Sequence, residues 1–156
     1  MFIAIYTAFL TWIDDTYARD VTGADSFNER FVTGQKQANE GLDGLDRLLR
    51  ETNLYYHGIQ ANVILTASLN FVTSTVLDFE TQGMPVSFYR MDIWFRVKLK
   101  CIISQVSPHA KSYATFLRTM SGICESYVMF TFPPEVPVKS YLQAVPEFCL
   151  GINYFK

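Results

Sequence analysis

The chain contains few of the residues that build cysteine-metal sites or nucleic-acid surfaces. Its three cysteines and two histidines show no CxxC or Cys/His spacing of the kind that binds metals. An odd number of cysteines also argues against a disulfide framework, so we expect buried thiols and a reducing, cytoplasmic environment. The formal net charge of −2 provides no basic surface and so excludes the usual electrostatic basis of nucleic-acid binding.

A secretory signal and a membrane span are also not expected. The first residues, Met1-Phe2-Ile3, lack the basic segment with which a secretory signal begins. The longest uncharged run, residues 58–77, reaches transmembrane length, but eight of its twenty residues are polar: Gln60, Asn62, Thr66, Ser68, Asn70, Thr73, Ser74 and Thr75. Lipid-facing helices rarely tolerate so many polar groups, so we predict a buried helix of a soluble bundle rather than an integral membrane protein.

What the chain does have is apolar residues at helical spacing. Hydrophobic residues make up 49% of the 156 positions and charged residues 18%, which is typical of one core-rich domain. The periodicity predicts an all-α fold with helices over about 2–16, around Leu42 to Leu49, and over about 60–79, 109–129 and 137–148. A further helix is expected to begin at a capping box formed by Ser26 and Glu29. The last helix is expected to kink near Pro146. The pairs Asp43–Arg47 and Asp46–Arg50 are expected on a solvated outer face.

The clearest chemical signal is the pair Asp14-Asp15, which ends an uncharged, mostly apolar run of thirteen residues. Negative charge at a helix C-terminus opposes the helix dipole, and a divalent cation such as Mg²⁺ would offset it. Asp14 is the best candidate ligand, whereas Asp15 points about 100° around the helix and is a better candidate for a supporting role. Asp20 can join them only if the helix breaks after Tyr17. The alternatives are a solvated helix end and, for Asp20, an ordinary loop acid.

Six short motifs occupy residues 11–15, 27–31, 69–71, 80–84, 113–122 and 132–134. In this order and spacing they resemble the trichodiene synthase family of fungal class I sesquiterpene cyclases, and the resemblance covers most of the chain. It implies an all-α enzyme that uses Mg²⁺ to ionise farnesyl diphosphate and then cyclises the cation.

The resemblance also assigns roles to particular residues. Asp14 matches the metal-binding aspartate, with Asp15 and Asp20 as further metal candidates, and Arg118 matches the arginine that senses the diphosphate. A guanidinium suits phosphate oxygens, although a structural salt bridge is the alternative for Arg118. Phe9, Trp12 and Phe71 could line the cavity and stabilise a carbocation, or could simply be core residues.

The chain departs from the family in two places. Residues 1–156 correspond to a partial cyclase domain: the helices before the aspartate motif, the second metal site expected after Asn153 and the C-terminal half are missing, so we expect this fragment to be inactive. The segment between Met84 and Ser107 is longer than expected for the family, and Val86-Ser87 recurs as Val106-Ser107. Residues 87–106 are therefore a possible insertion or retained intron. The alternatives are a non-catalytic helical interaction protein and, less well matched, a prenyl-chain-elongating enzyme, which would show two aspartate-rich motifs.

Overall fold

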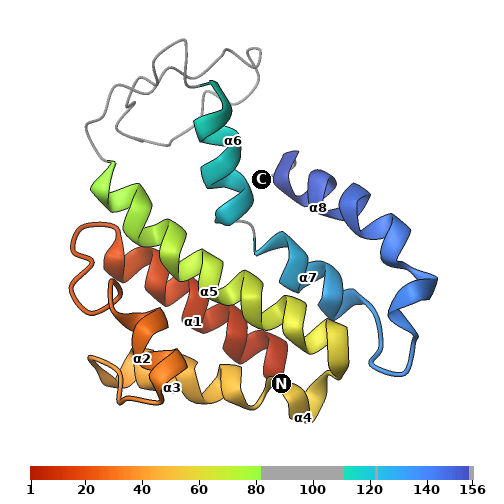
Figure 1. Ribbon diagram of the computed structural model, residues 1–156, viewed down its shortest axis with the longest axis horizontal. Helices are drawn as coiled ribbons and strands as arrows, with labels where there is room; N and C mark the ends of the chain where they lie inside the picture. Colours follow the sequence, from red (N-terminus) through yellow and green to blue (C-terminus); the bar gives the residue numbers. More distant parts are fainter. Residues whose placement is uncertain (82–110, 122, 155–156) are drawn as a thin grey trace.

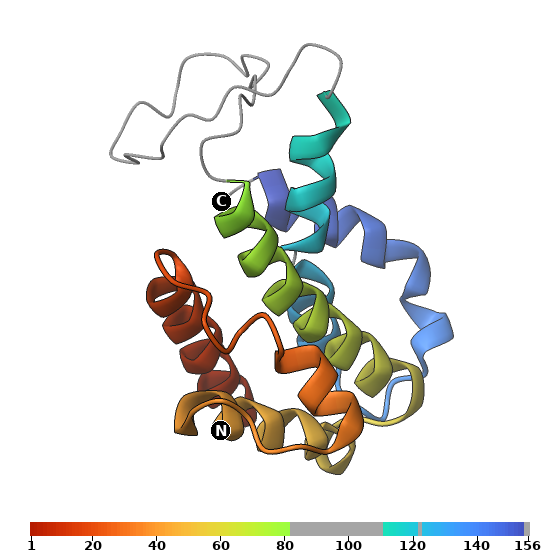
Figure 2. The ribbon, with the colours of Figure 1, turned by 60° about the vertical axis from the view of Figure 1, so that its left-hand side comes forward.

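Helix α5 (Gly58–Glu80) is the element against which most of the others pack. It contacts α1 (Phe2–Tyr17), α2 (Phe27–Thr33), α4 (Thr52–Tyr55), α6 (Lys111–Met120) and α7 (Cys124–Thr131). In the computed structural model, which describes residues 1–81, 111–121 and 123–154, α1 to α3 lie on one side of α5 and α6 to α8 on the other (Figures 1 and 2). The remaining elements are α3 (Glu40–Arg50), α8 (Val145–Tyr154) and two short 3₁₀ helices, Val138–Ser140 and Leu142–Ala144. Within these residues no strand occurs, and the prediction of an all-α fold is confirmed.

The polar residues of α5 explain how a helix of membrane-spanning length fits into this bundle. By length and composition alone α5 could cross a bilayer. Yet Gln60, Ser68 and Ser74 are buried, and each has a partner: the amide of Gln60 donates to Met129 O and Phe132 O at 2.7 and 2.9 Å. The two hydroxyls donate to backbone carbonyls one turn earlier in the same helix. These bonds remove the penalty of burying polar groups and leave α5 as the central packing helix.

Helix α1 buries one stripe of large side chains. Phe2, Tyr6, Leu10, Ile13 and Tyr17 are spaced three or four residues apart, so they lie on one face, and all five are buried. This face packs against α3 and α5. Both α1 and α5 run in the same direction, so that their C-terminal ends lie on the same side of the molecule (Figure 1).

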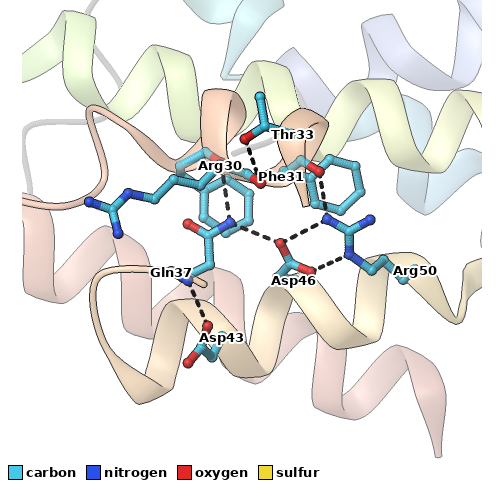
Figure 3. Close-up of polar contacts among 8 residues, drawn as sticks. Arg30, Phe31, Thr33, Gln37, Asp43, Asp46 and Arg50 are labelled. Atoms are coloured by element: carbon cyan, nitrogen blue, oxygen red, sulfur yellow. Dashed lines mark hydrogen bonds and ion pairs between the residues drawn. The ribbon is translucent and has the colours of Figure 1, made fainter. Parts of the chain in front are cut away.

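The connection between α2 and α3 is held by a partly buried polar cluster (Figure 3). The Asp46 carboxylate accepts from Arg50 Nε at 2.5 Å and from Gln37 Nε2 at 2.8 Å. Arg50 also donates to Phe31 O and lies 4.4 Å from the centre of the Phe31 ring. The expected pair Asp46–Arg50 therefore forms. The prediction that the pair lies on a solvated face is wrong for Asp46, which is only 8% exposed.

Three details of the predicted helices are also wrong. Ser26 does cap α2 in position, but its hydroxyl donates to Gly23 O at 3.4 Å and makes no capping bond. The single helix expected over 109–129 is divided into α6, which ends at Met120, and α7, which begins at Cys124. The intervening sequence contains Ser121 and Gly122, which are poor helix formers. Pro146 stands in the first turn of α8 instead of kinking a longer helix, since its missing N–H is harmless there. Residues 87–106, the possible insertion, lie outside the described residues.

Candidate active site

Asp14 and Asp15 lie in the last turn of α1, and both are exposed. That turn contains no basic residue, so nothing within the helix offsets two carboxylates next to the negative end of the helix dipole. The helix ends at Tyr17. This is the helix end that Asp20 would need in order to join Asp14 and Asp15 at a metal. The end of α1 is therefore an exposed negative site that a cation would stabilise.

Asp20 has a local structural role at this helix end. Its Oδ1 accepts from Thr22 N at 2.9 Å and from Thr22 Oγ1 at 2.6 Å, which closes a tight turn. These hydrogen bonds favour the ionised form and lower the pKa of Asp20. The geometry is what an ordinary loop acid shows, and a metal-binding role for Asp20 stays a prediction.

A fourth carboxylate near the end of α1, Asp78, is not among the residues that the sequence predicts for the site. Asp78 lies in the last turn of α5, and its pKa is raised by partial burial and then by the negative charge of Asp14. Two helices thus bring like charges close enough to influence each other. The signal was available, because Asp78 follows Leu77 near the end of an apolar helix, as Asp14 follows Ile13.

The donors at this end fit a loosely held Mg²⁺ ion. Carboxylate oxygens are its preferred protein ligands. Mg²⁺ usually keeps several bound waters and takes its other ligands from one or two carboxylates and from substrate phosphates. The described part of the chain holds no group of three or more His, Cys, Asp or Glu residues that could enclose a metal. Asp14, with Asp78 nearby, therefore suits a metal that takes most of its ligands from water and phosphate, and does not suit a protein cage.

A buried hydroxyl cluster fixes α1 against α5 and α7. The hydroxyl of Tyr6 donates to Ser126 Oγ at 3.0 Å and lies 2.8 Å from Ser68 Oγ. One residue further along α1, Thr7 Oγ1 lies 2.8 Å from the hydroxyl of Tyr127. Burial raises the pKa of Tyr6 to about 12, so the phenol is neutral at physiological pH. This cluster determines the position of α1 along its neighbours, and with it the position of Asp14 two turns later.

Phe9 and Trp12, two of the expected cavity residues, pack against α3. Their rings lie directly over Gly44 and Gly41, where a Cβ atom would collide with them. Phe71 is buried in the core. The three aromatic residues thus have the positions expected of core residues, and their contact with a substrate stays a prediction.

The close approach of α1 and α3 predicts a specific effect of adding one methyl group. A Cβ atom at Gly44 would lie 2.6 Å from Phe9 Cζ, so the ring must move. Overpacking costs about 1–3 kcal/mol, and the better helix propensity of alanine returns about 1 kcal/mol. We expect Gly44→Ala to lower the free energy of unfolding by about 1 kcal/mol in urea titrations, and Phe9→Leu to relieve that loss.

Gly151 provides the matched control for this prediction. It lies in α8, and a Cβ atom there would meet nothing within 4 Å. Gly151→Ala should therefore raise stability by about 0.5–1 kcal/mol through helix propensity alone. If Gly44→Ala is as stabilising as Gly151→Ala, the described packing of Phe9 on α3 is incorrect.

Arg118 lies in the last turn of α6, and its side chain is exposed. An exposed guanidinium keeps its contact with water, so burial gives this arginine no need of an anion. Helix α6 packs against α5, the helix that carries Asp78. Convergence of Arg118 and Asp14 on one pocket stays a prediction.

The chain is similar to fungal terpene synthases over nearly its whole length, although no sequence model of a known protein family matches it. It is 29% identical to alpha-cuprenene synthase COP6 of Coprinopsis cinerea, over 98% of this chain and 41% of that protein. It is 30% identical to terpene synthase BipA of Cochliobolus sativus, over 97% and 42%. It is 31% identical to longiborneol synthase CLM1 of Gibberella zeae, over 98% and 42%. The chain thus spans about two fifths of the length of these curated relatives.

Proposed function

We propose that this chain is part of a sesquiterpene synthase and holds the diphosphate of farnesyl diphosphate, with Mg²⁺, at the C-terminal end of α1. The observation that carries the proposal is the exposed Asp14 in a last helical turn that contains no basic residue. The similarity to terpene synthases over 97–98% of the chain supplies the substrate class, a prenyl diphosphate. The resemblance to trichodiene synthases narrows this class to farnesyl diphosphate.

The chemistry of ionisation explains why this helix end suits the substrate. When diphosphate leaves an allylic carbon, an anion separates from a carbocation, and the barrier falls if positive charge meets the developing anion. Mg²⁺, when bound, supplies that charge. Asp14 would hold the metal that carries the diphosphate, and Arg118 on α6 would donate to the phosphate oxygens, as the resemblance implies. The reaction that follows is cyclisation of the farnesyl cation, in the cytoplasm.

Removing the charge of Asp14 tests this assignment. Asp14→Asn keeps the size of the side chain and removes the negative charge, so we expect the affinity for Mg²⁺-diphosphate to fall about 10- to 100-fold, the loss of one charge-assisted contact. Isothermal titration calorimetry of the 156-residue chain with Mg²⁺ and inorganic diphosphate measures this. Glu51→Gln is the matched control and should leave the affinity unchanged. Glu51 is an exposed carboxylate between α3 and α4, and α4 lies beside the N-terminal end of α1, where the rings of Tyr55 and Phe2 are 4.9 Å apart (Figure 1). Equal effects of the two substitutions, or none, would remove Asp14 from the site.

A further inference from the structure

The last turn of α1 is fastened to the beginning of α3. Asn39 Nδ2 donates a hydrogen bond to the hydroxyl of Tyr17, the last residue of α1, at 2.8 Å. Tyr17 is only 3% exposed, and its ring meets the ring of Trp12 edge-on at a centroid distance of 5.7 Å. The Trp12 ring in turn covers Gly41 in the first turn of α3. The residues at positions 12 and 17, on either side of the aspartate pair, are therefore both anchored to the N-terminal end of α3.

A third contact ties the loop after α1 to the same end of α3. Gly23 has a φ of +93°, in the left-handed region that favours glycine. It packs so closely on Ala38 that a Cβ atom at Gly23 would lie 2.6 Å from Ala38 Cβ. Ala38 directly precedes Asn39 in the chain. The loop that follows α1 therefore approaches α3 at the same place as the last turn does.

Asn39 is itself held firmly, so it can fix what it contacts. It is the N-cap of α3, and its Oδ1 accepts from Leu42 N at 3.0 Å. The loop before it is bonded to the same helix, because Gln37 N donates to Asp43 Oδ1 at 2.7 Å. The amide of Asn39 is thus used at both ends, as an acceptor towards α3 and as a donor towards α1. This double use fixes the last turn of α1 relative to α3.

We propose that Asn39 is a positioning residue for the metal-bound diphosphate: through its hydrogen bond to Tyr17 it fixes the last turn of α1, and with it the direction of the Asp14 carboxylate. This inference rests on the proposed function, which places the metal at Asp14. Asn39 touches neither the metal nor the substrate. It restricts the backbone that carries the carboxylate, so less conformational freedom is lost when the metal-bound diphosphate is held. Loss of this restriction weakens binding without removing a ligand of the metal.

Two substitutions remove the hydrogen bond from opposite sides. Tyr17→Phe keeps the ring and its contact with Trp12, whereas Asn39→Ser keeps a capping oxygen for α3 but is too short to reach Tyr17. In calorimetry with Mg²⁺ and inorganic diphosphate, each should lower the affinity about three- to tenfold, which corresponds to one hydrogen bond. The double variant should bind no more weakly than either single variant, because both substitutions remove the same bond.

Thr73→Val is the matched control. It removes a hydrogen bond of the same length, 2.8 Å from Asn28 Nδ2 to Thr73 Oγ1, which joins α2 to α5 and does not involve α1. We expect a similar loss of stability in urea titrations and an unchanged affinity. In the Asp14→Asn background, Tyr17→Phe should have no further effect on the affinity, since it acts only through that carboxylate. A purely structural role would weaken binding in both backgrounds and would contradict the proposal.

Amide hydrogen exchange tests the contact without any ligand. Residues 14–17 should exchange about three- to tenfold faster in Tyr17→Phe and in Asn39→Ser, whereas residues 4–10 should keep the parent rates, because only the last turn is released. Equal acceleration along the whole of α1, or none, would overturn the proposal.

The affinities separate a failure of this proposal from a failure of the proposed function. If Asp14→Asn weakens binding but Tyr17→Phe and Asn39→Ser do not, the positioning role is wrong and the proposed function stands. If Asp14→Asn has no effect on binding, the proposed function is rejected. The positioning role is then rejected with it, and faster exchange of residues 14–17 would show only that Asn39 holds the helix end.

Discussion

Tyr6→Ala is expected to lower the free energy of unfolding by about 3–5 kcal/mol, the range for truncating a large buried ring. Tyr6 is fully buried and contacts the rings of Phe130 and Tyr127 at centroid distances of 5.0 and 6.3 Å. The substitution removes these contacts and leaves a cavity between α1, α5 and α7. Since a domain is stable by only about 5–15 kcal/mol, the loss is a large part of the total. Urea denaturation followed by circular dichroism measures it.

Tyr6→Phe separates the hydroxyl from the ring. We expect a smaller loss of about 1 kcal/mol, because Ser68 and Ser126 keep hydrogen bonds to Ile64 O at 2.6 and 3.3 Å. The pKa of Tyr6 is about 12 in the folded chain and 10.0 without the fold. Between these values the folded state binds more protons than the unfolded state, so stability falls as pH rises, by up to about 1.4 kcal/mol per pH unit. Tyr6→Phe should lose this part of the slope, and an unchanged slope would show that Tyr6 is not buried as described.

The 156-residue chain is expected to give no cyclic product from farnesyl diphosphate and Mg²⁺. The metal that Asp14 would hold and one guanidinium leave most of the diphosphate charge uncompensated, and a site open to water weakens each interaction. Gas chromatography of the extracted products should show nothing above a metal-free control. A cyclic hydrocarbon that disappears in Asp14→Asn would show that these 156 residues suffice for catalysis.

The sequence predicts the helices well where one apolar stripe dominates. The stripes of α1 and α5 are long and regular, so their bounds are confirmed to within two residues. Burial of Asp46 could not be predicted from the sequence. It depends on a hydrogen bond from Gln37, in the preceding loop, to the Asp46 carboxylate and on a hydrogen bond from Arg50 to Phe31 O. The break between α6 and α7 lies between Met120 and Cys124, and apolar residues continue on both sides of it, so the hydrophobic periodicity does not reveal it.

The candidate site was only partly predictable for a related reason. Asp14 was recognisable because its charge directly follows an apolar run. The proximity of Asp78 depends on α1 and α5 running in the same direction, which no local pattern indicates. The packing of Phe9 on Gly44 was likewise hidden, because a glycine within a charged helix gives no sign of the ring that covers it.

The most direct test of the account locates the metal-bound diphosphate itself. Mn²⁺ in place of Mg²⁺ broadens nuclear magnetic resonance signals close to it, so amide spectra of the labelled chain are recorded with Mn²⁺ and farnesyl diphosphate together. The account predicts selective broadening at Asp14, Asp15 and Asp78, which needs both ligands and is lost in Asp14→Asn. Broadening that is centred on another part of the chain, or that is unaffected by Asp14→Asn, would contradict a diphosphate site at the end of α1.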